Sequence, residues 1–257
     1  MIRNSKLETR NSALLPRMIY EDKNFLAVDK PAGLLVHPIA ASREPTLVDW
    51  LKKRYPEITK VGDDPGTRPG IVHRLDRDTS GIMLIARNQK YFEYLKNLFS
   101  AGGEISPLRG GQPQIKKTYR ALVHGRLTPK KGKIEKDILI KSGSIKRTVF
   151  KGRGERTAVT EYRVLKYLNG FSWVEVIPLT GRTHQIRVHL ASIGHPVVGD
   201  KLYTPKKYKA VRQPYIGRQM LHASSLEFSP APGKRIRLAA NLPGDMKAVL
   251  AKIAGNR

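Results

Sequence analysis

The chain has no cysteine, few acidic residues and no long apolar run. The lack of cysteine excludes disulfides, thiolate nucleophiles and cysteine-type zinc sites. No apolar stretch approaches the roughly 18 residues that a membrane-spanning helix needs, and the N-terminus lacks the apolar segment of a signal peptide. These absences predict a cytoplasmic protein with no membrane partner. Import into an organelle is the alternative, because residues 1–16 form a polar, basic leader that we expect to be loose.

The shortage of acids leaves a large positive charge, since 48 Lys and Arg stand against 21 Asp and Glu, a formal net of +27. Such a surplus predicts a polyanionic partner. From Arg109 to Arg156, 15 basic residues face 3 acidic ones, a net of +12. Tyrosines lie among the basic residues here and in a second basic cluster at 205–218, which favours RNA with splayed bases. DNA is disfavoured, because no helix-turn-helix, finger or basic-zipper pattern occurs; a solvated charged face is the alternative reading.

Strand-like alternation dominates the chain, and helical spacing is confined to a few segments. Helices are predicted at 47–55, 88–99, 182–193 and 244–254. Strands are predicted on both sides of a turn at 22–24, and at 81–86, 117–125, 133–141, 157–168, 171–179, 220–228 and 235–243. Runs of strands with few intervening helices predict an α+β fold with a mixed, mainly antiparallel sheet and flanking helices, rather than a doubly wound sheet.

Short polar and breaker residues mark the ends of two predicted helices. Thr46 after Pro45 opens the first helix and Pro56 ends it, while Thr180 and Gly194 are the predicted caps of the third. The second helix carries one aromatic and aliphatic stripe, at helical spacing, that predicts core packing rather than base stacking: Tyr91, Tyr94, Leu95, Leu98 and Phe99.

Several chemistries lack their motifs. No phosphate-binding G-x-x-x-x-G-K-[ST] or hydrolase G-x-S-x-G pattern occurs. His184 and His189 are five residues apart, so on a helix they point about 140° apart and do not face one metal. We therefore expect no metal and no nucleotide cofactor, and the remaining candidate is a carboxylate in a basic, RNA-binding pocket.

The stretch "RPGIVHRLDRDTSGIMLIAR", from Arg68 to Arg87, places Asp76 and Asp78 one residue apart. The apolar residues before Asp76 predict a strand end there, which would mount the carboxylate rigidly. From the pattern alone, the favoured interpretation is that Asp76 caps a turn or pairs with a neighbouring arginine. Asp76 and Asp78 could also form the carboxylate pair of a glycosidase, since residues i and i+2 of a strand share a face. A net charge of +27, however, suits a neutral sugar substrate poorly.

"HRLDRDTSG" resembles the active-site signature of the RluA-type RNA pseudouridine synthases. Four further segments resemble motifs of the same family, in order along residues 17–250: 29–38, 116–125, 179–203 and 220–223. The resemblance implies a single catalytic domain over 17–257 with the pseudouridine synthase fold and a central RNA-binding cleft. Many members also carry an N-terminal S4-like domain, for which 16 residues are too few, so we expect the catalytic domain itself to bind RNA.

The resemblance assigns three catalytic residues. Asp76 matches the nucleophile, Arg187 the arginine that pairs with it, and Tyr119 the tyrosine that packs against the target base. Attack of Asp76 at C1′ and formation of a glycal by deprotonation at C2′ both need an ionised carboxylate, and both routes stay open. Asp78 falls at a variable position of the signature, which predicts a structural role.

The resemblance also implies substrate contacts. Arg74 matches the residue that fills the gap left by the flipped uridine, and Leu221 belongs to an apolar pocket wall. His73 and Thr79, in the same signature, are predicted to bind substrate as well. Residues 100–115, rich in Gly and Pro, are expected to form a mobile loop near the RNA, or else a neutral insertion.

The predicted function is the isomerisation of specific uridines in structured RNA by a monomer that uses no cofactor. Large-subunit rRNA is favoured over tRNA as the substrate. The alternative is a catalytically silent RNA-binding or ribosome-assembly factor on the same fold.

Overall fold

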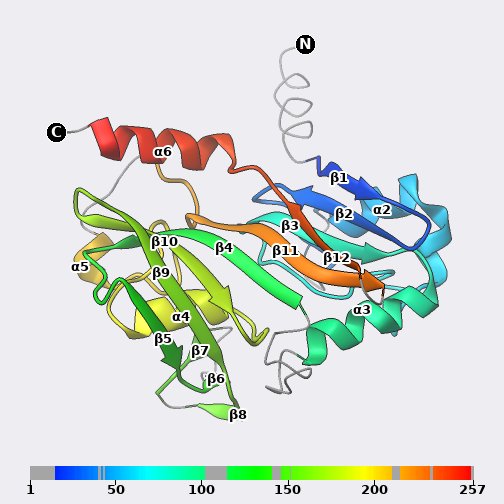
Figure 1. Cartoon of the computed structure of the whole chain (residues 1–257), viewed down its shortest axis with the longest axis horizontal. Coiled ribbons are helices and arrows are strands. Elements are labelled where there is room, and N and C mark those ends of the chain that lie inside the picture. Colours follow the sequence, from blue (N-terminus) through cyan, green and yellow to red (C-terminus); the bar gives the residue numbers. More distant parts are fainter. Residues whose placement is uncertain are drawn as a thin grey trace. The chain divides into compact units, whose positions relative to one another are not determined.

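The computed structural model describes residues 15–39, 42, 44–101, 115–140, 146–150, 152–209, 215–231 and 234–255 (Figure 1). The chain divides into two compact units. Unit 1 runs to Phe99 and includes Leu238–Ala240, and unit 2 holds Ser100–Arg237 and Asn241–Arg257. The predictions for the leader and for the loop at 100–115 fall mainly outside the described residues.

The described part of unit 1 contains a three-stranded antiparallel sheet and three helical segments. Strand β1 (Arg17–Glu21) pairs with β2 (Phe25–Lys30), and β2 pairs with β3 (Ser80–Ala86). The turn between β1 and β2 forms because the Asp22 carboxylate accepts hydrogen bonds from the amides of Asn24 and Phe25, at 2.7 and 2.9 Å. The two strands predicted around this turn are confirmed.

Helix α2 (Leu47–Arg54) begins and ends as its sequence predicts. The Thr46 hydroxyl accepts from the Asp49 amide at 3.2 Å, and the Asp49 carboxylate accepts from the Thr46 amide at 2.9 Å, which is a capping box. The short 3₁₀ helix η1 (Pro56–Lys60) follows, because Pro56 cannot continue the α-helical bonding.

Helix α3 (Gln89–Ala101) packs through a face close to the predicted one. Leu95 and Leu98 are buried and the Tyr91 ring stacks on Phe25 at 5.4 Å, so the prediction of core packing is confirmed. Phe92, left out of the predicted stripe, is 3% exposed. It lies three residues before Leu95, which places it on the same face.

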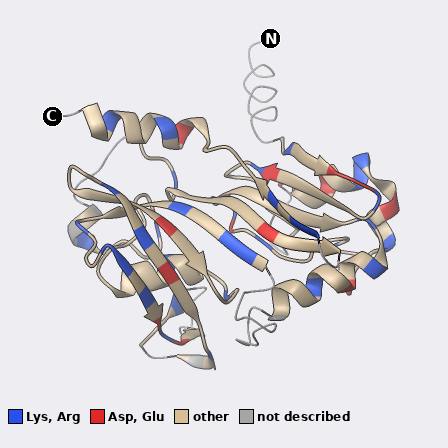
Figure 2. Cartoon of the chain, viewed as in Figure 1, with Lys and Arg blue, Asp and Glu red and all other residues tan. Residues whose placement is uncertain are grey.

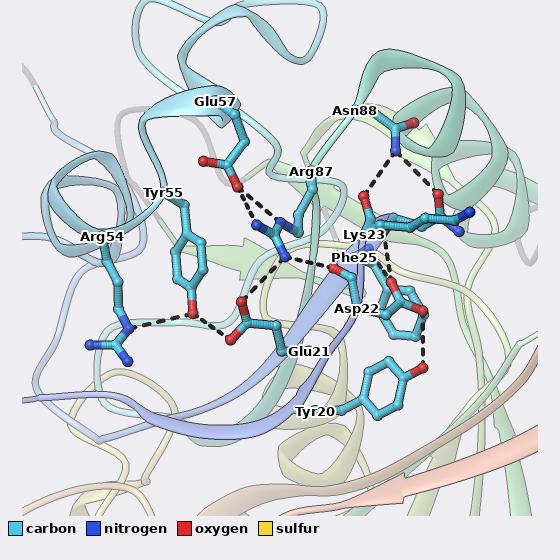
Figure 3. A network of polar contacts seen from close by, with 11 residues as sticks. Tyr20, Glu21, Asp22, Lys23, Phe25, Arg54, Tyr55, Glu57, Arg87 and Asn88 are labelled. Atoms are coloured by element: carbon cyan, nitrogen blue, oxygen red, sulfur yellow. Dashed lines mark hydrogen bonds and ion pairs between the residues drawn. The ribbon is translucent and has the colours of Figure 1, made fainter.

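A polar network holds the far end of β3 (Figure 3). Arg87, the residue after β3, donates to the Glu57 carboxylate at 2.9 Å and to the Glu21 carboxylate at 3.2 Å. It also donates to the Asp22 carbonyl at 2.7 Å, and Tyr55 donates to Glu21 at 2.9 Å. One guanidinium therefore joins the end of β3 to the β1–β2 turn and to η1.

The main sheet of unit 2 is antiparallel throughout its described pairs. Its strands follow the order β11 (Leu221–Ala231), β4 (Ile115–His124), β10 (Phe171–Pro178), β9 (Val159–Leu168) and β5 (Lys131–Glu135), with β12 (Lys234–Ala239) beside β11. A second sheet has the order β7 (Arg147–Thr148), β6 (Ile138–Ile140) and β8 (Arg153–Arg156). The predicted α+β class with mainly antiparallel sheet is confirmed, and the RNA-binding cleft stays a prediction.

The strand predicted at 133–141 is wrong as a single element. Its two halves are β5 and β6, which belong to different sheets. Ile134 packs into the core of the main sheet, whereas Ile138 packs with Ala158 and Val188 in a separate cluster. Because the two isoleucines enter different cores, the chain must leave the main sheet between them.

Helices cover both faces of the main sheet in unit 2. On one face of β4, Ala121 and Val123 pack with Leu190 of α4 (Gln185–Ser192). On the other face, Leu122 packs with Val249 of α6 (Gly244–Gly255). The short helix α5 (Lys206–Lys209) completes the described helices of this unit. Nowhere in the described part of the chain is a helix long and apolar enough to span a membrane.

Helix α4 starts later than predicted, and Thr180 is not its cap. His184 adopts a left-handed backbone, with φ of 58°, directly before the helix. The Thr180 hydroxyl accepts from the Val159 amide at 3.1 Å and donates to the Gln185 side chain at 2.7 Å. Thr180 therefore ties the loop before α4 to β9, and the helical turn forms only after His184.

Candidate active site

Asp76 lies in a loop that leads into β3, and the strand predicted before it is absent. Only one isolated bridge, Ile71 to Ile85, forms in that stretch. Instead of strand pairing, the His73 ring nitrogen Nε2 accepts from the Leu84 amide of β3 at 2.9 Å. The same ring stacks on Phe99, with centroids 4.1 Å apart. His73 thus fastens the loop to β3 and α3, and a substrate contact of its ring stays a prediction.

A tight turn fixes the backbone at Asp76. The Asp76 carbonyl accepts from the Thr79 amide at 3.1 Å, and all seven residues of β3 that follow are buried. Thr79 is 2% exposed, whereas Asp76 and Asp78 are half-buried. The carboxylate of Asp76 is therefore carried by a turn that leads directly into a buried strand. The contact of Thr79 with substrate stays a prediction.

A buried lysine holds the same turn from the side of β2. Lys30 is fully buried, and its ammonium donates to the carbonyls of Pro31, Leu34 and Arg77, at 2.8, 2.9 and 3.0 Å. The Arg77 carbonyl also accepts from the Gly33 amide at 2.9 Å. Lys30 therefore ties the 31–34 loop to the residue after Asp76, across 47 positions of sequence.

Arg74 is exposed and rests against a histidine. Its Nη1 lies 3.1 Å from His37 Nε2, and His37 Nδ1 lies 3.0 Å from the Pro38 carbonyl. Burial lowers the pKa of His37, and the positive charges of Arg74 and Arg68 lower it further. A neutral His37 donates from Nδ1 and accepts from Arg74 at Nε2, so it can orient this guanidinium.

Arg187 of α4 makes a buried, two-bonded ion pair in unit 2. Its Nε and Nη2 donate to the Asp200 carboxylate at 2.6 and 3.0 Å. The side chains of Arg187 and Asp200 are 6% and 0% exposed. Asp200 also accepts from the amides of Leu202 and Tyr203, at 2.8 and 3.1 Å, so four donors hold the carboxylate in place.

Tyr203 lies under the same guanidinium. The Arg187 carbon Cζ is 5.2 Å from the centre of the Tyr203 ring. The Tyr203 hydroxyl lies 2.8 Å from His184 Nδ1 and accepts from the Arg147 amide at 2.8 Å. Arg187 is thus fixed by a carboxylate at its edge and an aromatic ring on its face.

Tyr119 and Leu221 lie on neighbouring strands of unit 2. Tyr119, on β4, is half-buried and packs against the core that α4 covers, and Leu221, on β11, is 3% exposed in that same core. The strands pair Tyr119 with Ala223. Leu221 is therefore part of this apolar core, and its place in the wall of a substrate pocket and the contacts of both residues with a base stay predictions.

Lys117 is a buried cation that the sequence analysis missed. It lies two residues before Tyr119 on β4, is 6% exposed, and donates to the Thr180 carbonyl at 3.2 Å. Burial, with a smaller effect of the positive Arg182, lowers the pKa of Lys117 to about 8. The signal in the sequence is its phase, since Lys117 alternates with Ile115, Tyr119 and Ala121 on the inward face of β4.

The predicted site residues are divided between the two units. Unit 1 holds Asp76 with His73, Arg74 and Thr79; unit 2 holds Tyr119, Arg187 and Leu221. The pairing of Arg187 with Asp76 stays a prediction, and the sequence analysis missed the Asp200 partner of Arg187. In the described ranges, no group of three or more His, Cys, Asp or Glu side chains has the arrangement of a metal site.

Basic residues are spread over the strands of unit 2, among them β4, β5 and β9 (Figure 2). Two tyrosines of the basic clusters make contacts inside this unit. The Tyr208 ring stacks on His124 at 4.5 Å, and the Lys252 ammonium lies 4.8 Å from the Tyr215 ring centre. These two tyrosines therefore pack against residues of their own unit, although both stand in a basic stretch of the sequence.

The model of the RNA pseudouridylate synthase family matches residues 24–192, a range that includes parts of both units. The chain belongs to this family. An uncharacterized RNA pseudouridine synthase of Chloroflexus aurantiacus is 39% identical over 226 residues, which are 88% of this chain and 65% of that protein. Ribosomal large subunit pseudouridine synthase D of Zymomonas mobilis is 37% identical over 237 residues, which are 90% of this chain and 70% of that protein. The chain thus spans about two thirds of the length of these relatives.

Solved structures agree with this family. Human RNA Pseudouridylate Synthase Domain Containing 4 superposes with a TM-score of 0.70 at 25% identity, covering 97% of this chain and 95% of that chain. Human RNA Pseudouridylate Synthase Domain Containing 1 shares the fold, with a TM-score of 0.69 at 23% identity and coverages of 95% and 96%. The predicted family, its enzyme class and its fold are confirmed.

Proposed function

We propose that the chain is a cytoplasmic, monomeric RNA pseudouridine synthase that isomerises specific uridines of large-subunit rRNA without a cofactor. Family membership carries the proposal. The choice of rRNA over tRNA is supported by relatives from Zymomonas mobilis and Nitrosomonas europaea, both named ribosomal large subunit pseudouridine synthase D. A single catalytic domain over 17–257 is part of the proposal, and the family match over 24–192 supports it.

Asp76 is the proposed nucleophile. The reaction breaks the N1–C1′ bond of the uridine, rotates the freed uracil and joins its C5 to C1′. C5 then loses its proton, and N1, which carries no proton in uridine, gains one, so the product is an isomer of the substrate and no electrons are gained or lost. Attack at C1′ and removal of a proton at C2′ both need Asp76 ionised and held still. The turn closed by Thr79 and the anchor from Lys30 supply a fixed backbone at that point.

Arg187 is the proposed charge partner of Asp76, and Asp200 orients it. Asp200 binds Nε and Nη2 of Arg187 and so holds its guanidinium in one orientation. Tyr119 is the proposed contact for the target base, with Leu221 in the wall beside it and Arg74 filling the space that the uridine leaves.

The test is pseudouridine mapping of RNA treated with purified protein. Large-subunit rRNA and tRNA from cells lacking the gene are incubated with the wild type, Asp76→Asn or Asp78→Asn, and RNA binding is measured alongside. We expect a new pseudouridine in the rRNA with the wild type and with Asp78→Asn, and none with Asp76→Asn despite near-normal binding. Conversion by Asp76→Asn would overturn the nucleophile. Binding without conversion by the wild type would instead indicate the catalytically silent factor.

A further inference from the structure

The small sheet β6–β7–β8 displays large apolar side chains to solvent. Phe150, in the turn between β7 and β8, is 80% exposed, and Ile140, at the end of β6, is 47% exposed. A phenylalanine offers about 150–250 Å² of surface for burial, so exposing its ring forgoes a large gain unless a partner covers it. Such a partner must also suit the charge of the surroundings.

Those surroundings are strongly basic. Residues 136–158 contain seven Lys or Arg and two acidic residues. In the strand registers Ile140 lies opposite Arg147 on one side and Arg153 on the other. An aromatic ring among cations matches an unpaired RNA strand, whose bases stack on rings and whose phosphates bind Lys and Arg. An acidic protein could also bind the Lys and Arg side chains, but its carboxylates would not stack on the exposed Phe150 ring.

Two residues on either side of Lys151 have defined contacts in this segment. The Phe150 amide donates to the Thr148 hydroxyl at 3.1 Å. Gly152 follows against β6, where an added Cβ would lie 2.4 Å from the Ile140 carbonyl oxygen, so this close approach requires glycine. The Phe150 amide is therefore bonded next to the exposed ring, and a bonded backbone loses less entropy when a base stacks on that ring.

The small sheet also packs toward Arg187 through a buried residue of β6. Ile138 is buried with Ala158 and with Val188, the residue after Arg187 in α4. Tyr203 packs on this cluster, accepts from the Arg147 amide, and places its ring under the Arg187 guanidinium. The sheet thus contacts Tyr203, which in turn lies against the guanidinium of Arg187, a proposed catalytic residue on the unit that also carries Tyr119.

We propose that the β6–β7–β8 sheet is an RNA-docking surface on which Phe150 stacks an unpaired base near the target uridine and Arg147 binds the adjoining phosphate. This proposal rests on the proposed RNA substrate and names the element that recognises it. Phe150 is a binding residue outside the reaction itself, so it acts on substrate affinity rather than on the chemical step.

The test compares Phe150→Ala, Phe150→Trp and Arg147→Gln with Leu165→Ala, which truncates another exposed apolar side chain, 38% exposed, on β9 of the same unit. Binding of protein-free large-subunit rRNA is measured over a salt series, and KM and kcat are measured on the same RNA. Since stacking contributes about 1–3 kcal/mol per base, we expect Phe150→Ala to weaken binding by about 5- to 150-fold. KM should rise in proportion, with kcat close to that of the wild type.

The controls distinguish stacking from a structural effect. Phe150→Trp should restore binding, Leu165→Ala should change nothing, and Phe150→Ala should melt at the wild-type temperature because the ring is exposed. Arg147→Gln should reduce the salt dependence by about one phosphate contact, while Phe150→Ala leaves it unchanged. Wild-type binding and KM in Phe150→Ala would overturn this proposal alone. If the wild type binds rRNA through Phe150 but converts no uridine, the docking surface stands and the proposed reaction fails.

Discussion

The guanidinium of Arg187 is bound edge-on by the Asp200 carboxylate, through Nε at 2.6 Å and Nη2 at 3.0 Å, and both side chains are buried. A second arginine of unit 2, Arg218, makes the same two-bonded contact with Asp245, at 2.6 and 3.0 Å, but this carboxylate is 49% exposed. The two pairs differ mainly in their access to water, and this difference allows the effect of burial to be measured.

Asp200→Asn should destabilise the protein by about 3–5 kcal/mol, because it removes the charged carboxylate that binds two nitrogens of the buried guanidinium. Asp245→Asn should lower stability by about 1 kcal/mol at most, because water can solvate the exposed end of that pair. Urea unfolding followed by the fluorescence of Trp173, in unit 2, measures both changes. Equal losses in the two variants would mean that Asp200 does not neutralise Arg187.

Lys30→Met should loosen the Asp76 turn. The methionine leaves the carbonyls of Pro31, Leu34 and Arg77 without their buried donor, which predicts a loss of about 3 kcal/mol or more. Hydrogen exchange should quicken at the amides of Gly33 and Thr79, which bond within this region. Lys96→Met is the control, since Lys96 is an exposed partner of Asp63. Unchanged exchange at Thr79 would show that the turn holds without Lys30.

Gly70→Ala should be among the most damaging single-methyl additions in unit 1. Gly70 has φ of +67°, and its amide and carbonyl bond Val61 and Ala86, so an added Cβ would lie 2.5 Å from the Ala86 carbonyl oxygen. We expect a loss of about 3 kcal/mol or more, from strain and the displacement of β3. Gly170→Ala is a matched control, with φ of +72° and open space around it, and should cost only about 1 kcal/mol. Thermal unfolding of the two variants gives the comparison.

Lys117 should make stability rise with pH above about 8. Burial lowers its pKa in the folded protein to about 8 from the ordinary 10.5. Between these two values the unfolded chain binds a proton that the folded chain has lost, so raising the pH favours folding. The full rise, complete above pH 10.5, is about 3 kcal/mol. Lys117→Met should lack it, whereas Lys116→Met, at the half-buried neighbouring position, should retain it. Parallel stability profiles for the wild type and Lys117→Met would contradict the lowered pKa.

Local signals in the sequence predicted much of the fold. The capping box of Thr46 and Asp49, the Asp22 turn and the alternation of β9 and β10 each act within a few residues, so the elements they specify are correct. The split of 133–141 into β5 and β6 was not predictable, because it depends on which of two separate cores receives Ile134 and Ile138. The prediction of Thr180 as a helix cap failed because a long-range contact decides its role: its hydroxyl accepts from the Val159 amide on β9.

The candidate site residues were predicted from the resemblance of their motifs, and the contacts that hold these residues in the structure were not visible in the sequence. Lys30 appears in a motif segment, but its bond to the Arg77 carbonyl spans 47 residues and ends on the backbone, so no side-chain pattern reports it. Asp200 and Lys117 likewise stand in segments that resemble family motifs. Their burial depends on the packing of α4 against the sheet, which determines whether a charged residue faces water or the core.

The Lys30 ammonium donates to the backbone carbonyl of residue 77, a group that every amino acid has. The anchor therefore tolerates any residue at 77 whose backbone keeps the same course, and it places no demand on the side chain at 78. Random mutagenesis of these two positions should recover many active variants, while position 30 should admit almost none. The segment beside Asp76 can thus change its charge and shape toward the RNA over generations while the turn that carries the carboxylate stays fixed.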